Sequence, residues 1–116
     1  MNRAMELYRQ ACDGGFTAAC NDVGFGYDNG QGLPENSGEA ARFFQMACDG
    51  GEALGCVNLG RLHRSGRGVA EDAAKAVELF VGGCDAGEPA GCFAAGEMYR
   101  DGKGVGKDQA QATSYF

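Results

Sequence analysis

The sequence predicts an all-α solenoid, a stack of α/α hairpins that repeats every 36 residues. The first observation is the cysteine spacing, because two series of three cysteines each recur at this interval. The second is that the residues between the cysteines recur with them, and self-similarity at a fixed period of roughly 20–50 residues is typical of repeat architectures. The first series is Cys12, Cys48 and Cys84, and the second is Cys20, Cys56 and Cys92.

One helix of each repeat, the A helix, is predicted over residues 17–29, 53–65 and 89–101. In the second repeat Cys56, Leu59, Gly60 and His63 have the i, i+3, i+4, i+7 spacing of a buried helical stripe. A glycine within a helix costs about 1 kcal/mol relative to alanine, so we expect another helix to approach closely at this point. The equivalent stripes are Cys20, Val23, Gly24 and Tyr27, and Cys92, Ala95, Gly96 and Tyr99.

A second helix, the B helix, follows each A helix after a short glycine-containing loop. Each A helix should end at a glycine, which adopts the left-handed C-cap conformation without strain. Each B helix should begin after an Asn or Asp N-cap, and in two repeats a Glu or Gln three residues later predicts a capping box. The C-cap glycines are Gly30, Gly66 and Gly102, the N-caps are Asn36, Asp72 and Asp108, and the capping-box residues are Glu39 and Gln111.

The 116 residues are interpreted as a single domain, residues 1–116, that starts and stops inside B helices. It would comprise a partial B helix over 1–15 and repeats at about 16–51, 52–87 and 88–116, the last incomplete. Both ends would then carry apolar helix faces without a polar capping repeat, which favours self-association.

The amino-acid composition indicates the kind of cell compartment and argues against some classes of partner. Six cysteines in 12.0 kDa indicate an oxidising compartment, periplasmic or extracellular, although Met1-Asn2-Arg3 leads into the repeat without the apolar part of a signal peptide, as in a mature or excised segment. The net charge of −6 and the scattered ten basic residues argue against nucleic acid as a partner. No stretch approaches the ~20 apolar residues of a membrane span.

Six cysteines allow many pairings, and two regular schemes stand out. The first, which we favour, joins each cysteine of the first series to the one eight residues later and uses all six. The second joins Cys20 to Cys48 and Cys56 to Cys84, and leaves Cys12 and Cys92 as thiols. The spacing lacks the Cys-x2-Cys of zinc or dithiol redox sites, so we expect neither metal nor cofactor.

Three runs carry a resemblance to a known family: Ala53 to His63, the loop Gly66-Arg67-Gly68-Val69, and Asp72 to Ala76. They resemble the Sel1-like repeat, a relative of the tetratricopeptide repeat. With paired cysteines eight residues apart, the chain is similar to the cysteine-rich Sel1-like proteins typified by the Helicobacter cysteine-rich protein family. The resemblance implies a right-handed α/α superhelix with disulfides, and protein interaction as the usual role.

The analogy with tetratricopeptide arrays places a peptide or extended protein segment on the concave face of the A helices, against positions outside the packing stripe. Asn58 is the strongest candidate, because asparagine at the matching point of related repeats can bond a peptide backbone. Phe25 and Phe93 would be exposed aromatics, which resemble interface hot spots. The candidate residues are Asn21, Asp22, Phe25, Asn58, Arg61, Arg64, Phe93, Glu97 and Arg100.

Two other functions stay open. Some members of the cysteine-rich family carry a penicillin-binding or β-lactamase label, although the serines here lie in no Ser-x-x-Lys or Gly-x-Ser-x-Gly motif and we expect no catalytic residue. His63 occupies the slot of a packing tyrosine, and Gly102 to Lys107 departs from a phosphate loop. Other cysteine-rich Sel1-like proteins act as assembly factors in the mitochondrial intermembrane space, which is also oxidising.

Overall fold

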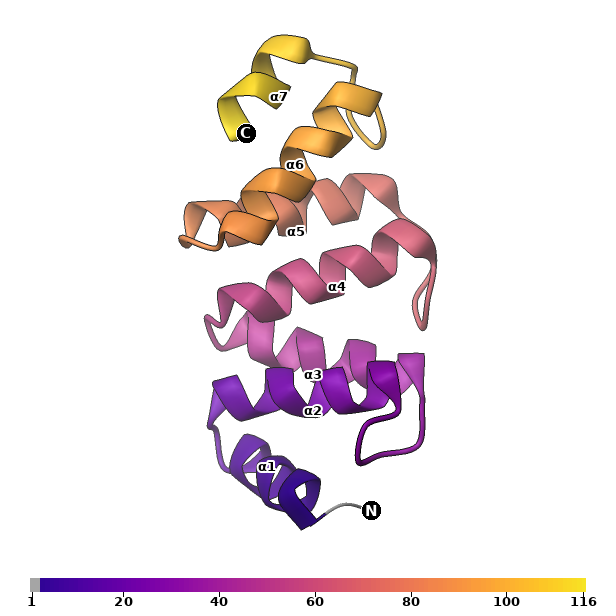
Figure 1. The fold of residues 1–116 in the computed structure, drawn as a ribbon, viewed down its shortest axis with the longest axis vertical. Helices are drawn as coiled ribbons and strands as arrows, with labels where there is room; N and C mark the ends of the chain where they lie inside the picture. The colour runs from indigo at the N-terminus through magenta and orange to yellow at the C-terminus, as the bar shows by residue number, and fades with distance from the viewer. Residues whose placement is uncertain (1–2) are drawn as a thin grey trace.

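The computed structural model describes residues 3–116, which form seven α-helices and no strand (Figure 1). The helices are α1 (Arg3–Asp13), α2 (Thr17–Asn29), α3 (Ser37–Asp49), α4 (Ala53–Ser65), α5 (Ala73–Asp85), α6 (Pro89–Asp101) and α7 (Gln109–Tyr115). They stack along one axis into a body of 47 × 24 × 17 Å, with the two ends of the chain at opposite ends (Figure 1). The predicted α/α solenoid is therefore confirmed; residues 1 and 2 of the expected segment 1–15 lie outside the described residues.

The three A helices, α2, α4 and α6, have the bounds that the sequence predicts. Each ends at a glycine in the left-handed conformation, with φ of 68° at Gly30, 70° at Gly66 and 68° at Gly102. The N–H of each of these glycines donates to the carbonyl four residues earlier, as at Gly30, which bonds to Gly26. The helix end is thus fixed by local chemistry.

The B helices begin with one-sided caps. The Asn36 side chain accepts a hydrogen bond from the Glu39 N–H at 3.1 Å, as an N-cap should. A capping box would also need the N–H of Asn36, and that group already donates to the Tyr27 carbonyl at 2.9 Å. The N–H of Asp108 donates to Tyr99 in the same way. The capping boxes predicted in two repeats are therefore wrong, because the preceding A helix takes the donor.

The mid-helix glycines explain how closely A and B helices pack. A Cβ at Gly24 would lie 2.6 Å from the Phe44 ring, and one at Gly60 would lie 2.8 Å from the Phe80 ring. Phe44 and Phe80 are among the most buried side chains, with 1% and 0% exposed. The expected close approach is confirmed, and what approaches is an aromatic ring of the next B helix.

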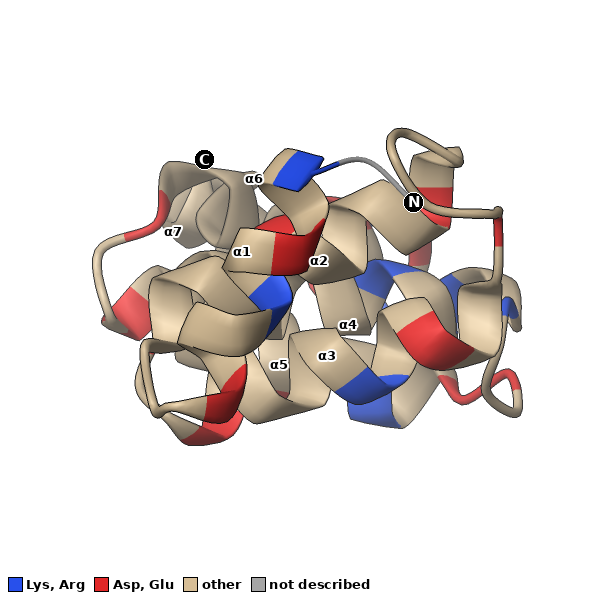
Figure 2. Cartoon of the chain, turned by 90° about the horizontal axis from the view of Figure 1, so that it is seen from below, with Lys and Arg blue, Asp and Glu red and all other residues tan. Residues whose placement is uncertain are grey.

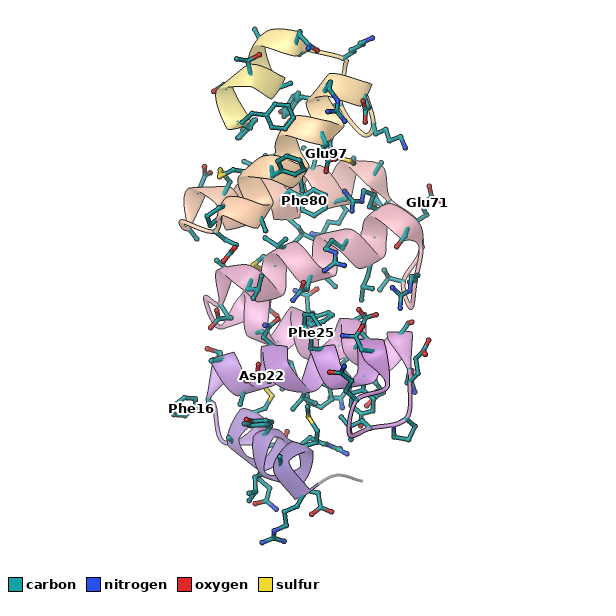
Figure 3. All side chains as sticks on the ribbon, viewed as in Figure 1. Phe16, Asp22, Phe25, Glu71, Phe80 and Glu97 are labelled. Atoms are coloured by element: carbon teal, nitrogen blue, oxygen red, sulfur yellow. A yellow bond between two sulfur atoms is a disulfide. The ribbon has the colours of Figure 1, made fainter. Side chains whose placement is uncertain are left out.

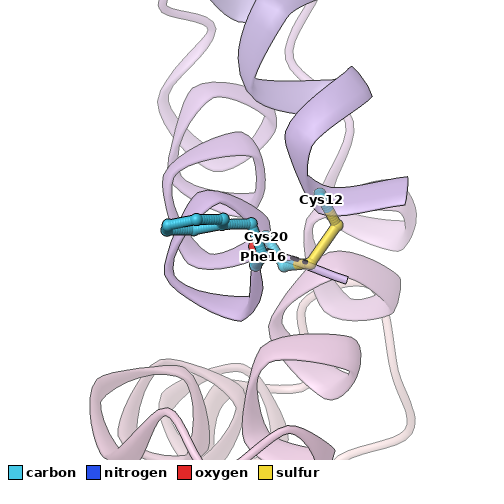
Figure 4. Close-up of a disulfide and its surroundings, with 3 residues drawn as sticks. All are labelled: Cys12, Phe16 and Cys20. Atoms are coloured by element: carbon cyan, nitrogen blue, oxygen red, sulfur yellow. Dashed lines mark hydrogen bonds between the residues drawn. A yellow bond between two sulfur atoms is a disulfide. The ribbon is translucent and has the colours of Figure 1, made fainter. Parts of the chain in front are cut away.

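Three disulfides join each B helix to the A helix that follows: Cys12–Cys20, Cys48–Cys56 and Cys84–Cys92. This is the first of the two pairing schemes. Figure 4 shows the Cys12–Cys20 bridge between α1 and α2, close to Phe16 at the turn. Three disulfides in a chain of this size are typical of an oxidising environment. Within residues 3–116, no helix combines the length and apolar character needed to cross a membrane.

Candidate functional site

The A helices present most of the candidate residues on the surface. Exposed or half-buried candidates are Asp22 and Phe25 on α2, Arg61 and Arg64 on α4, and Phe93, Glu97 and Arg100 on α6. Figure 3 shows Asp22, Phe25 and Glu97 in one view of the stack. We call the surface formed by these seven residues the A face.

Two candidates do not lie on the A face. Asn21 and Asn58 are only 7% and 3% exposed. The Asn58 Nδ2 donates to the Asn21 Oδ1 at 2.9 Å, and the Asn58 Oδ1 accepts a hydrogen bond from Arg61 at 3.3 Å. The expectation of an open, groove-facing amide at Asn58 therefore differs from the structure, in which this amide bridges neighbouring A helices.

The repeat explains this burial. Val57 and Ala94, the equivalents of Asn21 and Asn58 one repeat later, are also buried, with 2% and 7% exposed. Val57 and Ala94 belong to one apolar cluster, so both positions are used for packing in the next repeat as well. The helical stripe of a single repeat could not reveal this, because the contact is between repeats.

A small cavity opens between α2 and α4, with a volume of about 120 Å³. Its wall is apolar at Phe44 and Leu62, which are 1% and 2% exposed. The polar lining comes from Asp28, Asn58, Arg61, Arg64, Ser65 and Arg67. We call this the arginine cavity.

Arg67 lines the arginine cavity and is not among the candidate residues predicted from the sequence. It lies in the loop after α4, where the recurring Gly-x-Gly-Val pattern indicated only an interhelical turn. Folding brings it to Asp28, 39 residues earlier, with a nitrogen–oxygen distance of 2.7 Å. In the sequence, the only sign that Arg67 could be a candidate residue is its positive charge within the loop.

Other charges on the A face are paired more loosely. Arg64 and Arg100 lie 3.9 Å and 4.0 Å from the Glu97 carboxylate. Arg100 also bonds to its neighbour Asp101 at 3.1 Å, which lowers the pKa of that carboxyl and raises the pKa of the guanidinium. Acidic and basic residues are otherwise interspersed over the stack (Figure 2), so the arginine cavity is a local concentration of positive charge in a chain of net charge −6.

Phe25 and Phe93 are 42% and 59% exposed, as expected of surface aromatics. Phe93 also packs against Phe116, the residue that follows α7, with ring centroids 5.5 Å apart. Part of its surface is therefore used within the fold.

Two further features concern the single histidine and the side chains that could bind a metal. The His63 Nδ1 lies 3.3 Å from the Ala70 carbonyl oxygen, so one ring nitrogen is close to the backbone of the following loop. Within residues 3–116, no three His, Cys, Asp or Glu side chains gather as metal ligands would.

Comparison with solved structures finds closely similar folds. A protective antigen of uropathogenic Escherichia coli with an SLR fold is 31% identical over 97% of this chain and 24% of its own, with a TM-score of 0.93. A Sel1 repeat protein of Oxalobacter formigenes is 27% identical over 97% and 46%, with a TM-score of 0.88. Helicobacter pylori cysteine rich protein B is 25% identical over 97% and 80%, with a TM-score of 0.75.

This chain thus spans about a quarter of the E. coli protein and about half of the Oxalobacter protein. Comparison with curated proteins gives no significant match. The Sel1 repeat family model matches residues 1–16, 17–52, 53–87 and 89–116, nearly the whole chain. With its α/α hairpins, 36-residue period and disulfides, the chain belongs to the Sel1 repeat family, whose members commonly mediate protein interactions.

Proposed function

We propose that the protein is an interaction module that binds a peptide or an extended protein segment on the A face. The observation that carries the proposal is the contrast between repeated and variable positions. The packing residues recur, whereas one surface position of the A helices is Phe25, then Arg61, then the half-buried Glu97. Each repeat therefore offers a different chemistry to a partner lying across the stack, which suits specific recognition.

We expect the residues at this face to contribute unequally to the binding energy. Phe25 offers a large apolar surface, 42% exposed, and aromatic and arginine side chains supply most of the energy in protein interfaces. Asn58 contributes indirectly, because its amide holds Arg61. No contact in residues 3–116 favours the β-lactam alternative over this one, and it is not proposed.

Peptide selection against the oxidised protein tests the proposal. We expect a displayed random library to yield peptides that bind the parent chain, and Phe25→Ala to weaken them about tenfold, the cost of losing one hot-spot side chain. Gln45→Ala, at an exposed position of the B helix α3, is the matched control and should leave the affinity unchanged. Failure to select any peptide, or selected peptides insensitive to Phe25→Ala and cross-linked outside the A helices, would contradict the proposal.

We place this activity in the periplasm or outside the cell, with the mitochondrial intermembrane space as the alternative. The support is the set of three disulfides, which are maintained in oxidising compartments. Fractionation of the source cells with thiol labelling tests the placement. Recovery of the protein with free thiols in a reducing compartment would contradict it.

A further inference from the structure

The geometry points to the arginine cavity as a pocket for a carboxylate, carried by an acidic residue of a peptide bound on the A face. This inference rests on the proposed function and names the chemistry of the partner. It follows from three features of the cavity: its unequal charges, its apolar wall and the hydrogen bond that Arg61 donates to Asn58.

The charges of the cavity do not balance. Three arginines and one aspartate line it. Asp28 is already paired with Arg67 at 2.7 Å, so the positive charges that remain are Arg61 and Arg64. Within residues 3–116, Arg61 has no carboxylate within 4.0 Å, and its hydrogen bond is to the Asn58 amide.

Arg64 is free to turn toward a ligand at little cost. Its nearest carboxylate is that of Glu97 at 3.9 Å, and the side chains of Arg64 and Glu97 are 38% and 34% exposed. Exposed ion pairs of this kind contribute little, because water screens them. Its guanidinium also lies over the Phe80 ring, 5.3 Å from the centroid, and a cation–π contact of a partly exposed arginine is likewise weak.

The surroundings strengthen attraction to an anion. Phe44 and Leu62 form a wall of low polarity, and an ion pair beside such a wall is screened less than one in open water. Asn58, which is buried and lines the cavity, accepts a hydrogen bond from the Arg61 guanidinium at 3.3 Å, and this reduces the freedom that Arg61 would lose on binding.

The lining favours a carboxylate. Six of the eight residues that line the cavity are polar or charged, which disfavours an aromatic or long apolar side chain. Guanidinium groups present pairs of N–H donors that match the two oxygens of a carboxylate. The pocket also gives an acidic segment a place to bind on a chain whose net charge of −6 would otherwise repel it.

A nuclear magnetic resonance titration of the oxidised full chain tests the pocket directly. The probe is the blocked peptide acetyl-Ala-Glu-Ala-amide, and the signals are the arginine Nε–H groups. We expect saturable shifts at Arg61 and Arg64, at least about tenfold weaker binding of the Gln analogue, and weaker binding as salt is raised. Arg42, paired with Glu39 at 3.1 Å on a B helix, is the internal control and should not shift.

Variants should change the affinity in both directions. Arg61→Gln and Arg64→Gln should each weaken the Glu peptide about fivefold or more, whereas Asp28→Asn should tighten it by removing the competing carboxylate and freeing Arg67. Arg42→Gln should have no effect. A purely structural role for these residues would not produce opposite effects, and unfolding curves of each variant show whether the fold is kept.

Specific outcomes overturn the inference. They are the absence of a saturable shift with the Glu peptide, equal shifts at Arg42, or an unchanged affinity in both Arg61→Gln and Arg64→Gln. Inorganic phosphate that saturates where the Glu peptide does not would also overturn it in favour of a phosphate site. If selected peptides still depend on Phe25 but contain no acidic residue, the interaction module stands and the carboxylate pocket does not.

Discussion

The Asn58 side chain donates a hydrogen bond of 2.9 Å to the Asn21 side chain across the buried seam between α2 and α4. At the next seam, between α4 and α6, the equivalent residues are Val57 and Ala94, both buried. The same structural position therefore holds a polar pair once and an apolar pair once. The amide pair is tolerated there because, within residues 3–116, no fully buried side-chain nitrogen or oxygen lacks a hydrogen-bond partner.

Removing one amide of this pair should destabilise the protein more than removing both. Asn58→Ala leaves the Asn21 amide buried without its partner, at a cost of about 1–3 kcal/mol. The double variant Asn21→Val with Asn58→Ala reproduces the Val57–Ala94 seam and should recover most of that loss. Urea unfolding followed by circular dichroism measures the cycle. Simple additivity of the two single changes would mean that the amides do not stabilise each other.

The glycines of the A helices should not tolerate a methyl group. Gly60→Ala gains helix propensity, about 1 kcal/mol, but its Cβ would lie 2.8 Å from the Phe80 ring, and overpacking costs about 1–3 kcal/mol. We expect net destabilisation. Gly82→Ala on α5 is the control, because its Cβ meets nothing within 4 Å, and it should stabilise the protein. Thermal melting checks both signs, and a higher melting temperature for Gly60→Ala would contradict the packing argument.

Each disulfide should stabilise the fold without creating it. Replacing Cys48 and Cys56 together by alanine removes a bridge that closes a loop of about nine residues, worth about 2.5 kcal/mol in the chain-entropy model. The variant should melt at a lower temperature and keep the circular dichroism of a helical protein. Measurements before and after adding a reductant to the parent chain give the same comparison for all three bridges. A variant as stable as the parent would show that the loop closure contributes nothing.

Stability should fall at alkaline pH through Tyr115. Burial, with smaller contributions from Tyr99 and Asp85, raises the pKa of the Tyr115 phenol above its ordinary value of 10.0. The contribution of the neutral phenol is fully present below that ordinary pKa and is lost as pH rises through the higher, folded-state pKa. Unfolding free energies of the parent should therefore decline above about pH 10. Tyr115→Phe should decline less, and equal declines would exclude Tyr115 as the cause.

The elements of the fold could be predicted because their signals are local. The C-cap glycine at Gly66 and the N-cap at Asp72 act on backbone groups within one helical turn, so neighbouring residues decide where a helix ends or begins. The 36-residue period then indicates that the hairpins stack on one another. The failed capping boxes mark the limit of this reasoning, because the Asn36 N–H is taken by Tyr27 of the preceding helix.

The site could be predicted only in outline. Exposed positions such as Phe25 and Arg61 follow from the helical stripe of one repeat, whereas the burial of Asn58 does not. Arg67 meets Asp28 across 39 residues, and no spacing within a repeat indicates that contact.

The helices, their caps and the all-α class follow from the amino-acid sequence, because each depends on residues within one hairpin, and the repeat follows from the 36-residue period. Which polar residues are buried between repeats, and which charges gather around the arginine cavity, depends on the stacking of the hairpins. Those outcomes depend on which faces of neighbouring helices meet, as Asn21 and Asn58 do from non-equivalent positions of the repeat. Only stacking brings those faces together, because the two residues belong to different hairpins.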